Sequence, residues 1–213
     1  TSIINYVDIL SKEGDLSDKE AEYLGVLQRQ SARLKKLIED LIEASKASTG
    51  NLEVHMEPTD VEMLLEQALG ERLAACKLQP VVTNYLTKKY GAQADCHVMA
   101  DGRHLWRVFD NLIGNIIKYA QPNSRVYIDI DEAEPGEITV TFKNISKEPL
   151  NISGDELKER FVRGDRSRNT EGNGLGLSIA QSLMELQNGK VEIMIDGDLF
   201  KVVLLLKTGN CKN

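Results

Sequence analysis

A spacing of mostly apolar residues in the first quarter of the chain limits its fold more than any other feature. These residues lie alternately three and four positions apart: Leu24, Leu27, Ser31, Leu34, Ile38 and Leu41. The 3.5-residue repeat predicts a helix that packs along other helices at a shallow angle. Ser17 and Glu20 form a capping-box pattern, S-x-x-E, which predicts where this helix begins. We expect it to continue to about Ser48.

The length of this helix predicts how its apolar seam is covered. At about 1.5 Å per residue it would extend about 45 Å, and a short helix predicted over residues 1–12 is not enough to cover it. We therefore predict a homodimer in which two helical hairpins form a four-helix bundle. The alternative is an amphipathic helix folded against its own globular domain.

A different pattern begins after Thr49-Gly50-Asn51, so we expect a dimerisation hairpin over residues 1–51 and a second domain over residues 52–213. A second capping-box pattern, Thr59 with Glu62, predicts the start of a helix. The predicted strands cover residues 52–56, 80–86, 96–100, 126–130, 138–142, 190–195 and 199–207, and the predicted helices cover residues 59–76, 102–120 and a segment ending near 187. Neighbouring strand pairs predict an α+β fold, a two-layer sandwich with helices on one face of a mixed, mostly antiparallel sheet.

Composition narrows the classes of function. The formal net charge of −7 argues against nucleic-acid binding, because neutralising phosphates needs clustered Lys and Arg. Cys76, Cys96 and Cys211 are widely spaced without a C-x-x-C pair, which fits a reducing compartment. No apolar run reaches the roughly 18 residues of a membrane span. We expect a soluble, cytoplasmic piece whose membrane anchor would lie upstream of Thr1.

The helix predicted over residues 102–120 carries two asparagines on one face. Asn111 and Asn115 are four residues apart, and Lys118 and Tyr119 follow them. A hard oxygen ligand, a cation and an aromatic ring suit a magnesium nucleotide. The alternative is a solvated helix face. The apolar residues assigned to the core side are Leu105, Val108, Leu112 and Ile116.

Two further patterns precede the last predicted helix. Glycines at positions 172, 174 and 176 would let backbone N–H groups approach an anion at the helix N-terminus, although flexible loops often contain such glycines. Their spacing matches neither the dinucleotide fingerprint nor a P-loop. The polar stretch over residues 145–171 is long enough to be a lid over a nucleotide. A solvent-facing loop with Phe161 tucked into the core is the alternative.

Together, these patterns resemble the sensor histidine kinase family over essentially the whole chain. Residues 111–119 are similar to its N box, residues 159–163 to its F box and residues 172–177 to its second glycine box. The resemblance implies a Bergerat-type ATP-binding domain, shared in outline with gyrase-type ATPases and certain chaperones. Residues 1–10 resemble the stretch just after the family's H box, so the phosphoacceptor histidine should lie shortly before Thr1.

The resemblance also implies roles for residues. Asn115 would ligate Mg²⁺ and Asn111 would support it or position the reacting groups, while Lys118 would contact phosphate and Tyr119 would pack on adenine. The F-box and glycine-box residues expected to bind ATP are Phe161, Arg163, Gly172, Gly174, Leu175 and Gly176. The chain would transfer the γ-phosphoryl of ATP to a histidine, and a response regulator would accept it on an aspartate.

Two departures from the family pattern keep other functions open. Asn144 stands where the family's first glycine box has an adenine-reading Asp, and the glycines that should follow are missing. The only histidines, His55, His97 and His104, lie outside the predicted bundle helices and are expected to be structural. The runner-up hypothesis is a dimeric signalling module that binds nucleotide poorly. An ATPase or chaperone of the same fold is disfavoured because the 3.5-repeat helix precedes the ATP-binding domain.

Overall fold

The computed structural model describes residues 7, 9–10, 17–48, 52–75, 81–84, 96–150 and 176–209. The chain divides into two compact units, Thr1–Ser45 and Lys46–Asn213. The helix predicted over residues 1–12 and the lid predicted over residues 145–171 lie largely outside the described residues.

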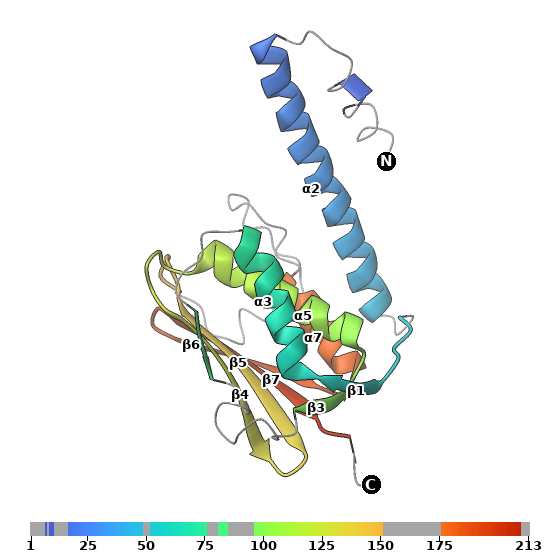
Figure 1. Ribbon diagram of the computed structural model, residues 1–213, viewed down its shortest axis with the longest axis vertical. Helices are drawn as coiled ribbons and strands as arrows, with labels where there is room; N and C mark the ends of the chain where they lie inside the picture. The colour runs from blue at the N-terminus through green and yellow to red at the C-terminus, as the bar shows by residue number, and fades with distance from the viewer. Residues whose placement is uncertain are drawn as a thin grey trace. The chain divides into compact units, whose positions relative to one another are not determined.

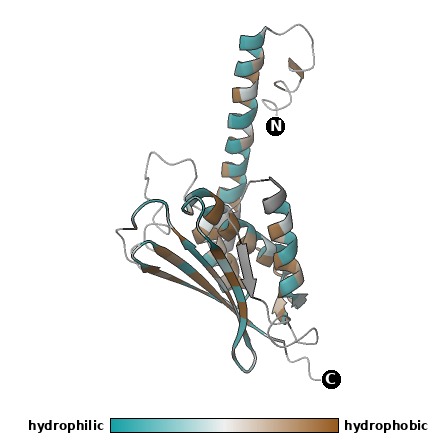
Figure 2. Cartoon of the chain, turned by 60° about the vertical axis from the view of Figure 1, so that its left-hand side comes forward, coloured by the Kyte–Doolittle hydropathy of each residue, from teal (hydrophilic) through white to brown (hydrophobic). Residues whose placement is uncertain are grey.

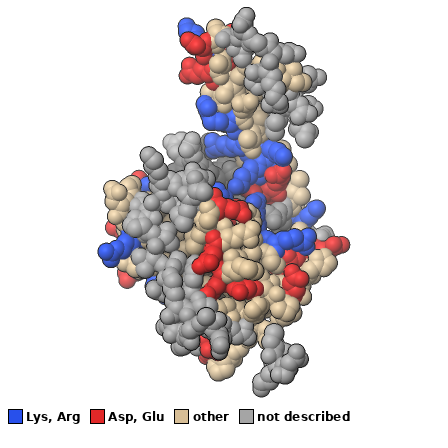
Figure 3. Space-filling model, in the orientation of Figure 1, with Lys and Arg blue, Asp and Glu red and all other residues tan. Residues whose placement is uncertain are grey.

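Helix α2, Asp18–Ser48, confirms the helix predicted from the 3.5-residue repeat. Its first turn is capped by Glu20, whose carboxylate accepts the Ser17 backbone N–H at 2.9 Å and the Ser17 hydroxyl at 2.7 Å. Acidic residues in the first turn and Lys46 in the last complement the helix dipole. Figure 3 shows the acidic side chains near the start of α2 and basic ones farther along it.

The apolar seam of α2 is uncovered in the single chain. Leu27, Leu34, Ile38 and Leu41 are each exposed by half or more, between 50% and 60%. Figure 2 shows hydrophobic and hydrophilic residues alternating along the whole helix. A helix with this much exposed apolar surface is typical of one that packs against a partner.

The second unit contains a five-stranded sheet with the order β2-β4-β5-β7-β6. Its strands are β2 Val81–Asn84, β4 Val126–Glu134, β5 Glu137–Ile145, β6 Lys190–Asp196 and β7 Leu199–Lys207. Strand β2 pairs parallel to β4, and every other pair is antiparallel. The predicted mixed, mostly antiparallel sheet is therefore confirmed, including the hairpins that turn at Pro135-Gly136 and at Gly197.

Helices α3 Val61–Ala75, α5 Gly102–Tyr119 and α7 Gly176–Leu186 cover one face of this sheet, as Figure 1 shows. The alternation of each long strand sends every second side chain toward these helices. Phe142 of β5 meets Phe109 of α5, with ring centroids 6.1 Å apart. The core residues predicted on α5, Leu105, Val108, Leu112 and Ile116, are all buried. Full burial of each such side chain contributes about 1.5–3 kcal/mol to the free energy of folding.

The structure corrects the prediction for residues 52–62. The strand lies at β1, Glu57–Asp60, and pairs antiparallel with β3, His97–Ala100. Helix α3 begins only after Asp60, whose carboxylate accepts the Met63 backbone N–H at 3.0 Å. The Thr59 hydroxyl instead lies within hydrogen-bond distance of two carbonyl oxygens, that of Glu57 at 3.1 Å and that of Ala100 at 3.2 Å. Pairing with a strand far along the chain thus overrides the local capping signal.

Helix α7 ends in a Schellman motif. The Gly189 N–H donates to the Met184 carbonyl at 2.8 Å, and the Asn188 N–H donates to the Glu185 carbonyl at 3.1 Å. Asn188 adopts a left-handed conformation with φ 58°, as the position after a helix C-cap requires. The chain therefore turns directly from α7 into the edge strand β6.

Candidate functional site

Helix α5 is the platform of the candidate site, and Asp101 fixes where it begins. The Asp101 side chain accepts the backbone N–H groups of Arg103 at 3.0 Å and His104 at 3.4 Å. From that start, the apolar residues of α5 face the sheet. The polar residues predicted for the site, at positions 111, 115, 118 and 119, are each only partly buried.

Asn111 lies against the first residue of α7. A Cβ placed on Gly176 would lie 3.5 Å from Asn111 Oδ1, so the backbone at the start of α7 runs close beside this side chain. Asn111 Nδ2 is buried and has no hydrogen-bond partner among the described residues. A buried amide without a partner is costly, and it marks a place where a polar ligand atom could be accommodated.

Asn115 lies one helical turn beyond Asn111, on the same side of α5. It is partly buried, and its amide offers an oxygen of the kind that Mg²⁺ prefers. No group of three or more His, Cys, Asp or Glu side chains that could hold a metal occurs in the described part of the chain. A metal held here would depend on amide oxygens and on the ligand's own oxygens.

The C-terminal end of α5 meets the end of strand β5. The Lys147 N–H donates to the Tyr119 carbonyl at 2.9 Å, and the Gln121 N–H donates to the Ile145 carbonyl at 2.7 Å. Lys118 Nζ lies 4.9 Å from the centroid of the Tyr119 ring. The cation and the ring are thus side by side at the point where β5 ends.

Asn144 is a buried polar residue at the end of an otherwise apolar series. It follows Ile138, Val140 and Phe142 on the helix-facing side of β5 and is only 4% exposed. Its Nδ2 donates to the Ile145 carbonyl at 3.2 Å. The other atom of the amide, Oδ1, is an acceptor, and the residue lies close to the C-terminal end of α5.

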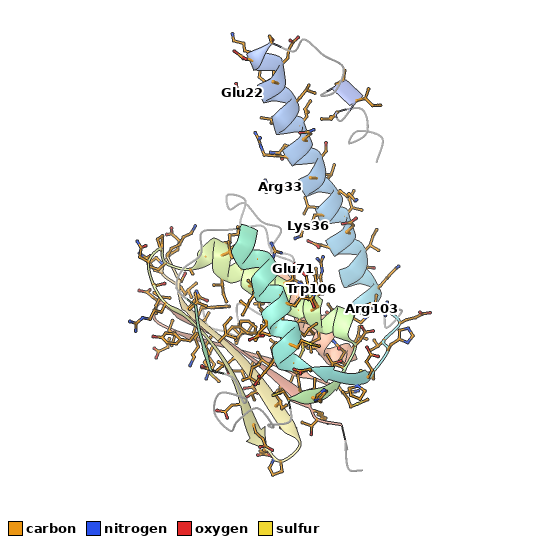
Figure 4. The ribbon with its side chains drawn as sticks, viewed as in Figure 1. Glu22, Arg33, Lys36, Glu71, Arg103 and Trp106 are labelled. Carbon is orange, nitrogen blue, oxygen red and sulfur yellow. The ribbon has the colours of Figure 1, made fainter. Side chains whose placement is uncertain are left out.

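At the other end of α5, Asp101 joins three segments. Its carboxylate accepts the His55 backbone N–H at 2.9 Å, and its own N–H donates to Gln187 Oε1 at 2.8 Å. Arg103, labelled at this end of α5 in Figure 4, places Nη2 3.1 Å from Asp101 Oδ2. His104 Nε2 lies 3.0 Å from the Glu53 carbonyl oxygen. The segment before β1, the start of α5 and the end of α7 therefore meet at one residue, Asp101.

The electrostatics of Asp101 follow from these contacts. Burial raises the pKa of its carboxyl group. The Arg103 guanidinium, the His55 backbone N–H and the nearby His104 outweigh burial and hold that pKa below its usual range. Asp101 is therefore charged at neutral pH although it is only 2% exposed.

The structure brings together part of the set of residues predicted for the site. Asn111 and Gly176 are adjacent, Asn115 shares the helix face of Asn111, and the Lys118-Tyr119 pair lies beside the end of β5 that carries Asn144. Other predicted site residues lie outside the described residues: Phe161, Arg163, Gly172, Gly174 and Leu175. The sequence interpretation missed Asp101 and Gln187, although an Asp directly before a predicted helix is an N-cap signal.

The predictions for the histidines can also be checked. His97 lies on β3 and His104 lies in the first turn of α5, as expected. His55 lies before β1 rather than on a strand, because the predicted strand is displaced to Glu57–Asp60. None of the three lies on α2. Among the residues that the structure describes, no helix combines the length and apolar character needed to cross a membrane.

Two protein-family models match the chain. The family described as histidine kinase-, DNA gyrase B- and HSP90-like ATPase matches residues 100–208, which include α5, α7 and the sheet strands from β4 onward. The His Kinase A (phospho-acceptor) domain matches residues 1–50. The phosphoacceptor match precedes the ATPase match along the chain, and residues 51–99 lie between them.

Curated relatives match most of the chain but are longer than it. The sensor protein VanSC of Enterococcus gallinarum is 30% identical over 196 residues, which cover 90% of this chain and 52% of that protein. The sensor protein kinase WalK of Staphylococcus epidermidis is 29% identical over 197 residues, which cover 90% of this chain and 31% of that protein. The chain therefore spans about half, or less, of the length of these relatives.

Solved structures share the fold at low sequence identity. The Acinetobacter baumannii histidine kinase AdeS is similar with a TM-score of 0.69 and 18% identity, over 98% of this chain and 95% of that one. Full-length ShkA in complex with AMPPNP gives a TM-score of 0.76 at 18% identity, over 97% of this chain and 43% of that one. The histidine kinase ThkA in complex with the response regulator protein TrrA gives 0.65 at 18% identity, over all of this chain and 58% of that one.

Proposed function

We propose a function on the premise that this chain belongs to the histidine kinase-, DNA gyrase B- and HSP90-like ATPase family, as one of its sensor histidine kinases. The chain is the ATP-binding core of a two-component kinase. It binds ATP between α5, α7 and the end of β5 and directs the γ-phosphoryl group to a histidine.

The observation that carries this proposal is the Asn111 side chain beside the start of α7, whose Nδ2 has no hydrogen-bond partner in the described part of the chain. The first N–H groups of a helix have no partner within the helix and carry the positive end of its dipole, so they attract phosphate oxygens. Asn111 Nδ2 is a buried donor without a partner among the described residues, and Oδ1 of the same side chain lies beside Gly176 at the start of α7. An anionic ligand at this point would satisfy both sets of donors.

The other residues of the site suit the remaining parts of ATP. Tyr119 offers a ring against which adenine can pack, and Asn144 Oδ1 can accept from the adenine amino group. Lys118, beside the Tyr119 ring, can reach the phosphates as a mobile cation. Helix α5 holds all of these residues except Asn144, and strand β5 holds that one.

Mg²⁺ fits the donors present at the site. Asn115 would be its protein ligand, with Asn111 one turn away, and the other oxygens would come from phosphate and water. When bound, Mg²⁺ would neutralise charge on the phosphoryl groups. This chain's own part is to hold an amide oxygen on a rigid helix that is packed against the sheet.

The uncovered seam of α2 supports a homodimer. Two copies of α2 would bury the apolar residues that are exposed in the single chain, including Leu34 and Ile38. Residues 1–50, which match the phosphoacceptor domain, contain no histidine, so none of the three histidines of the chain is proposed as the phosphoacceptor. The whole protein would work at the cytoplasmic face of a bacterial membrane and pass phosphate to a response regulator, the class of partner present in the solved ThkA complex.

One observation favours a second candidate function. Asn144 is neutral where the family's pattern has an Asp, and an amide acceptor holds an amino group less tightly than a carboxylate does. A chain with weak adenine recognition could serve as a dimeric signalling module with little kinase activity. Nucleotide affinity separates this function from the first.

Calorimetric titration with ADP and with a non-hydrolysable ATP analogue, each with and without Mg²⁺, tests the proposal on this chain directly. We expect micromolar affinity that is strengthened by Mg²⁺. Asn115→Ala should remove most of the Mg²⁺ dependence, whereas Gln67→Ala, on the exposed side of α3, should not change it. No binding up to millimolar nucleotide would favour the signalling module.

A further inference from the structure

Helices α5 and α7 are joined at both ends of their contact. At one end, Gly176 lies beside Asn111. At the other, the Asp101 N–H donates to Gln187 Oε1 at 2.8 Å. Asn111 follows Asp101 by about 15 Å along α5, and Gly176 precedes Gln187 by about 16 Å along α7, at 1.5 Å per residue. The two helices therefore run antiparallel with matching lengths between their two junctions.

The junction at Gln187 is fully bonded and buried. Gln187 is 3% exposed, and its Nε2 donates to the Leu183 carbonyl at 2.8 Å. Its Oε1 is an acceptor for the N–H of the residue that caps α5. A shift of α7 along its axis would break a buried hydrogen bond, so these bonds oppose such a shift.

We propose that Gln187 is a positioning residue for the phosphates of the bound nucleotide: it fixes the position of α7 along α5 so that the start of α7 faces Asn111. The inference rests on the nucleotide site proposed above. Gln187 does not touch the ligand, because it acts from the opposite end of α7. Loss of Gln187 should weaken the binding of the phosphates and not that of adenine. The residues proposed to bind adenine, Tyr119 and Asn144, lie on α5 and β5 and not on α7.

This division of the site suggests a comparison of two ligands. ADP carries phosphates and adenosine does not, so only ADP senses the position of the α7 N-terminus. Gln187→Met keeps the volume of the side chain but removes both hydrogen bonds. Gln181→Met is the matched control, because Gln181 lies on the same helix and its side chain makes only an exposed hydrogen bond among the described residues, to Glu185 at 2.9 Å.

We expect Gln187→Met to weaken ADP binding at least about fivefold, the usual effect of losing one buried hydrogen bond, while adenosine binding stays within about twofold. Gln181→Met should bind both ligands as the wild type does. Equal losses for ADP and adenosine, or no loss for either, would overturn the proposal. If Gln187→Met does not fold, Gln187→Asn, with the same amide on a shorter side chain, should show the same selective loss.

A measurement without nucleotide separates this inference from the proposed function. In isotopically labelled protein, we expect a nuclear Overhauser contact between the Asn111 side-chain amide and Gly176 in the wild type and in Gln181→Met, but not in Gln187→Met. A wild type that binds neither ligand would refute the nucleotide site. The Overhauser contact would still decide the role of Gln187, since its persistence in Gln187→Met would mean that Gln187 does not set the position of α7.

Discussion

The His55 backbone N–H lies 2.9 Å from Asp101 Oδ2, so a residue that precedes β1 is bonded to the residue that caps α5. The same carboxylate also accepts from Arg103 and caps the first turn of the helix. These bonds stabilise the charged form of Asp101, which is the reason that its pKa lies below the usual range.

Asp101 should make the stability of the protein depend on pH. A lowered pKa contributes stability that is fully present above the unfolded-state value of about 4 and is lost as pH falls toward the folded-state value. At pH 7, Asp101→Asn should lower the free energy of unfolding by about 1–3 kcal/mol. The difference from wild type should shrink as pH falls below 4. Urea unfolding at pH 7 and pH 3 measures both quantities.

The exposed Asp196, at the turn between β6 and β7, provides the control for this experiment. Asp196→Asn should follow the wild type at both pH values. A difference between Asp101→Asn and wild type that is the same at pH 7 and pH 3 would show that the charge of Asp101 does not stabilise the fold.

Asn144→Asp should strengthen adenine recognition at a cost in stability. A carboxylate accepts a hydrogen bond more strongly than an amide does, so we expect ADP to bind about tenfold tighter. Without nucleotide, a buried and unpaired charge should lower the free energy of unfolding by about 1–3 kcal/mol. Calorimetry with ADP and GDP, together with thermal unfolding, tests both effects. Equal gains for ADP and GDP would mean that Asn144 does not read the adenine amino group.

Two glycine-to-alanine substitutions should have opposite effects on stability. A Cβ on Gly189 would lie 2.6 Å from Met184 Cε and 2.9 Å from the Leu205 carbonyl oxygen. Because the second contact is with backbone, Gly189→Ala should destabilise the protein by about 2 kcal/mol. Gly70, on the exposed side of α3, has no atom within 4 Å of an added Cβ, so Gly70→Ala should stabilise it by up to about 1 kcal/mol. Urea midpoints that move in the same direction would contradict this assignment.

The exposed seam of α2 predicts the oligomeric state. Ile38 is 51% exposed in the single chain, and Ile38→Lys would place a charge in the core of the proposed four-helix bundle. We expect the wild type to sediment as a dimer and Ile38→Lys as a monomer. Lys36→Gln, a change of a labelled polar residue in Figure 4, should leave the dimer intact. A wild type that is monomeric at high protein concentration would exclude the bundle.

Local periodicity predicted the helices and strands that bury one face, because the apolar residues of that face recur at the period of the element. The alternation at Val126, Ile128 and Ile130 identified a strand because every second residue faces the helices, and the repeat in α2 identified a helix for the corresponding reason. The strand β1 was misplaced because its position is set by pairing with β3. A four-residue strand carries too few residues for a pattern of its own.

The sequence predicted the parts of the candidate site that depend on local spacing. Asn111 and Asn115 share a helix face by their spacing alone, and the glycine at position 176 was expected at a helix start. The bond between Asp101 and Gln187 joins residues 86 positions apart, and no local pattern in the sequence signals it. The sequence therefore did not predict the tertiary contact that sets how these two helices align.

Strand β6 lies at one edge of the described sheet. A strand of another molecule can pair with such an edge. The residues along β6 that face away from the helices include Lys190 and Glu192, whose side chains pair at 2.7 Å. Charges at an edge oppose the addition of a further strand. The domain can therefore expose a short β-edge beside its working helices and still resist fibril-like association when it is concentrated in the cell.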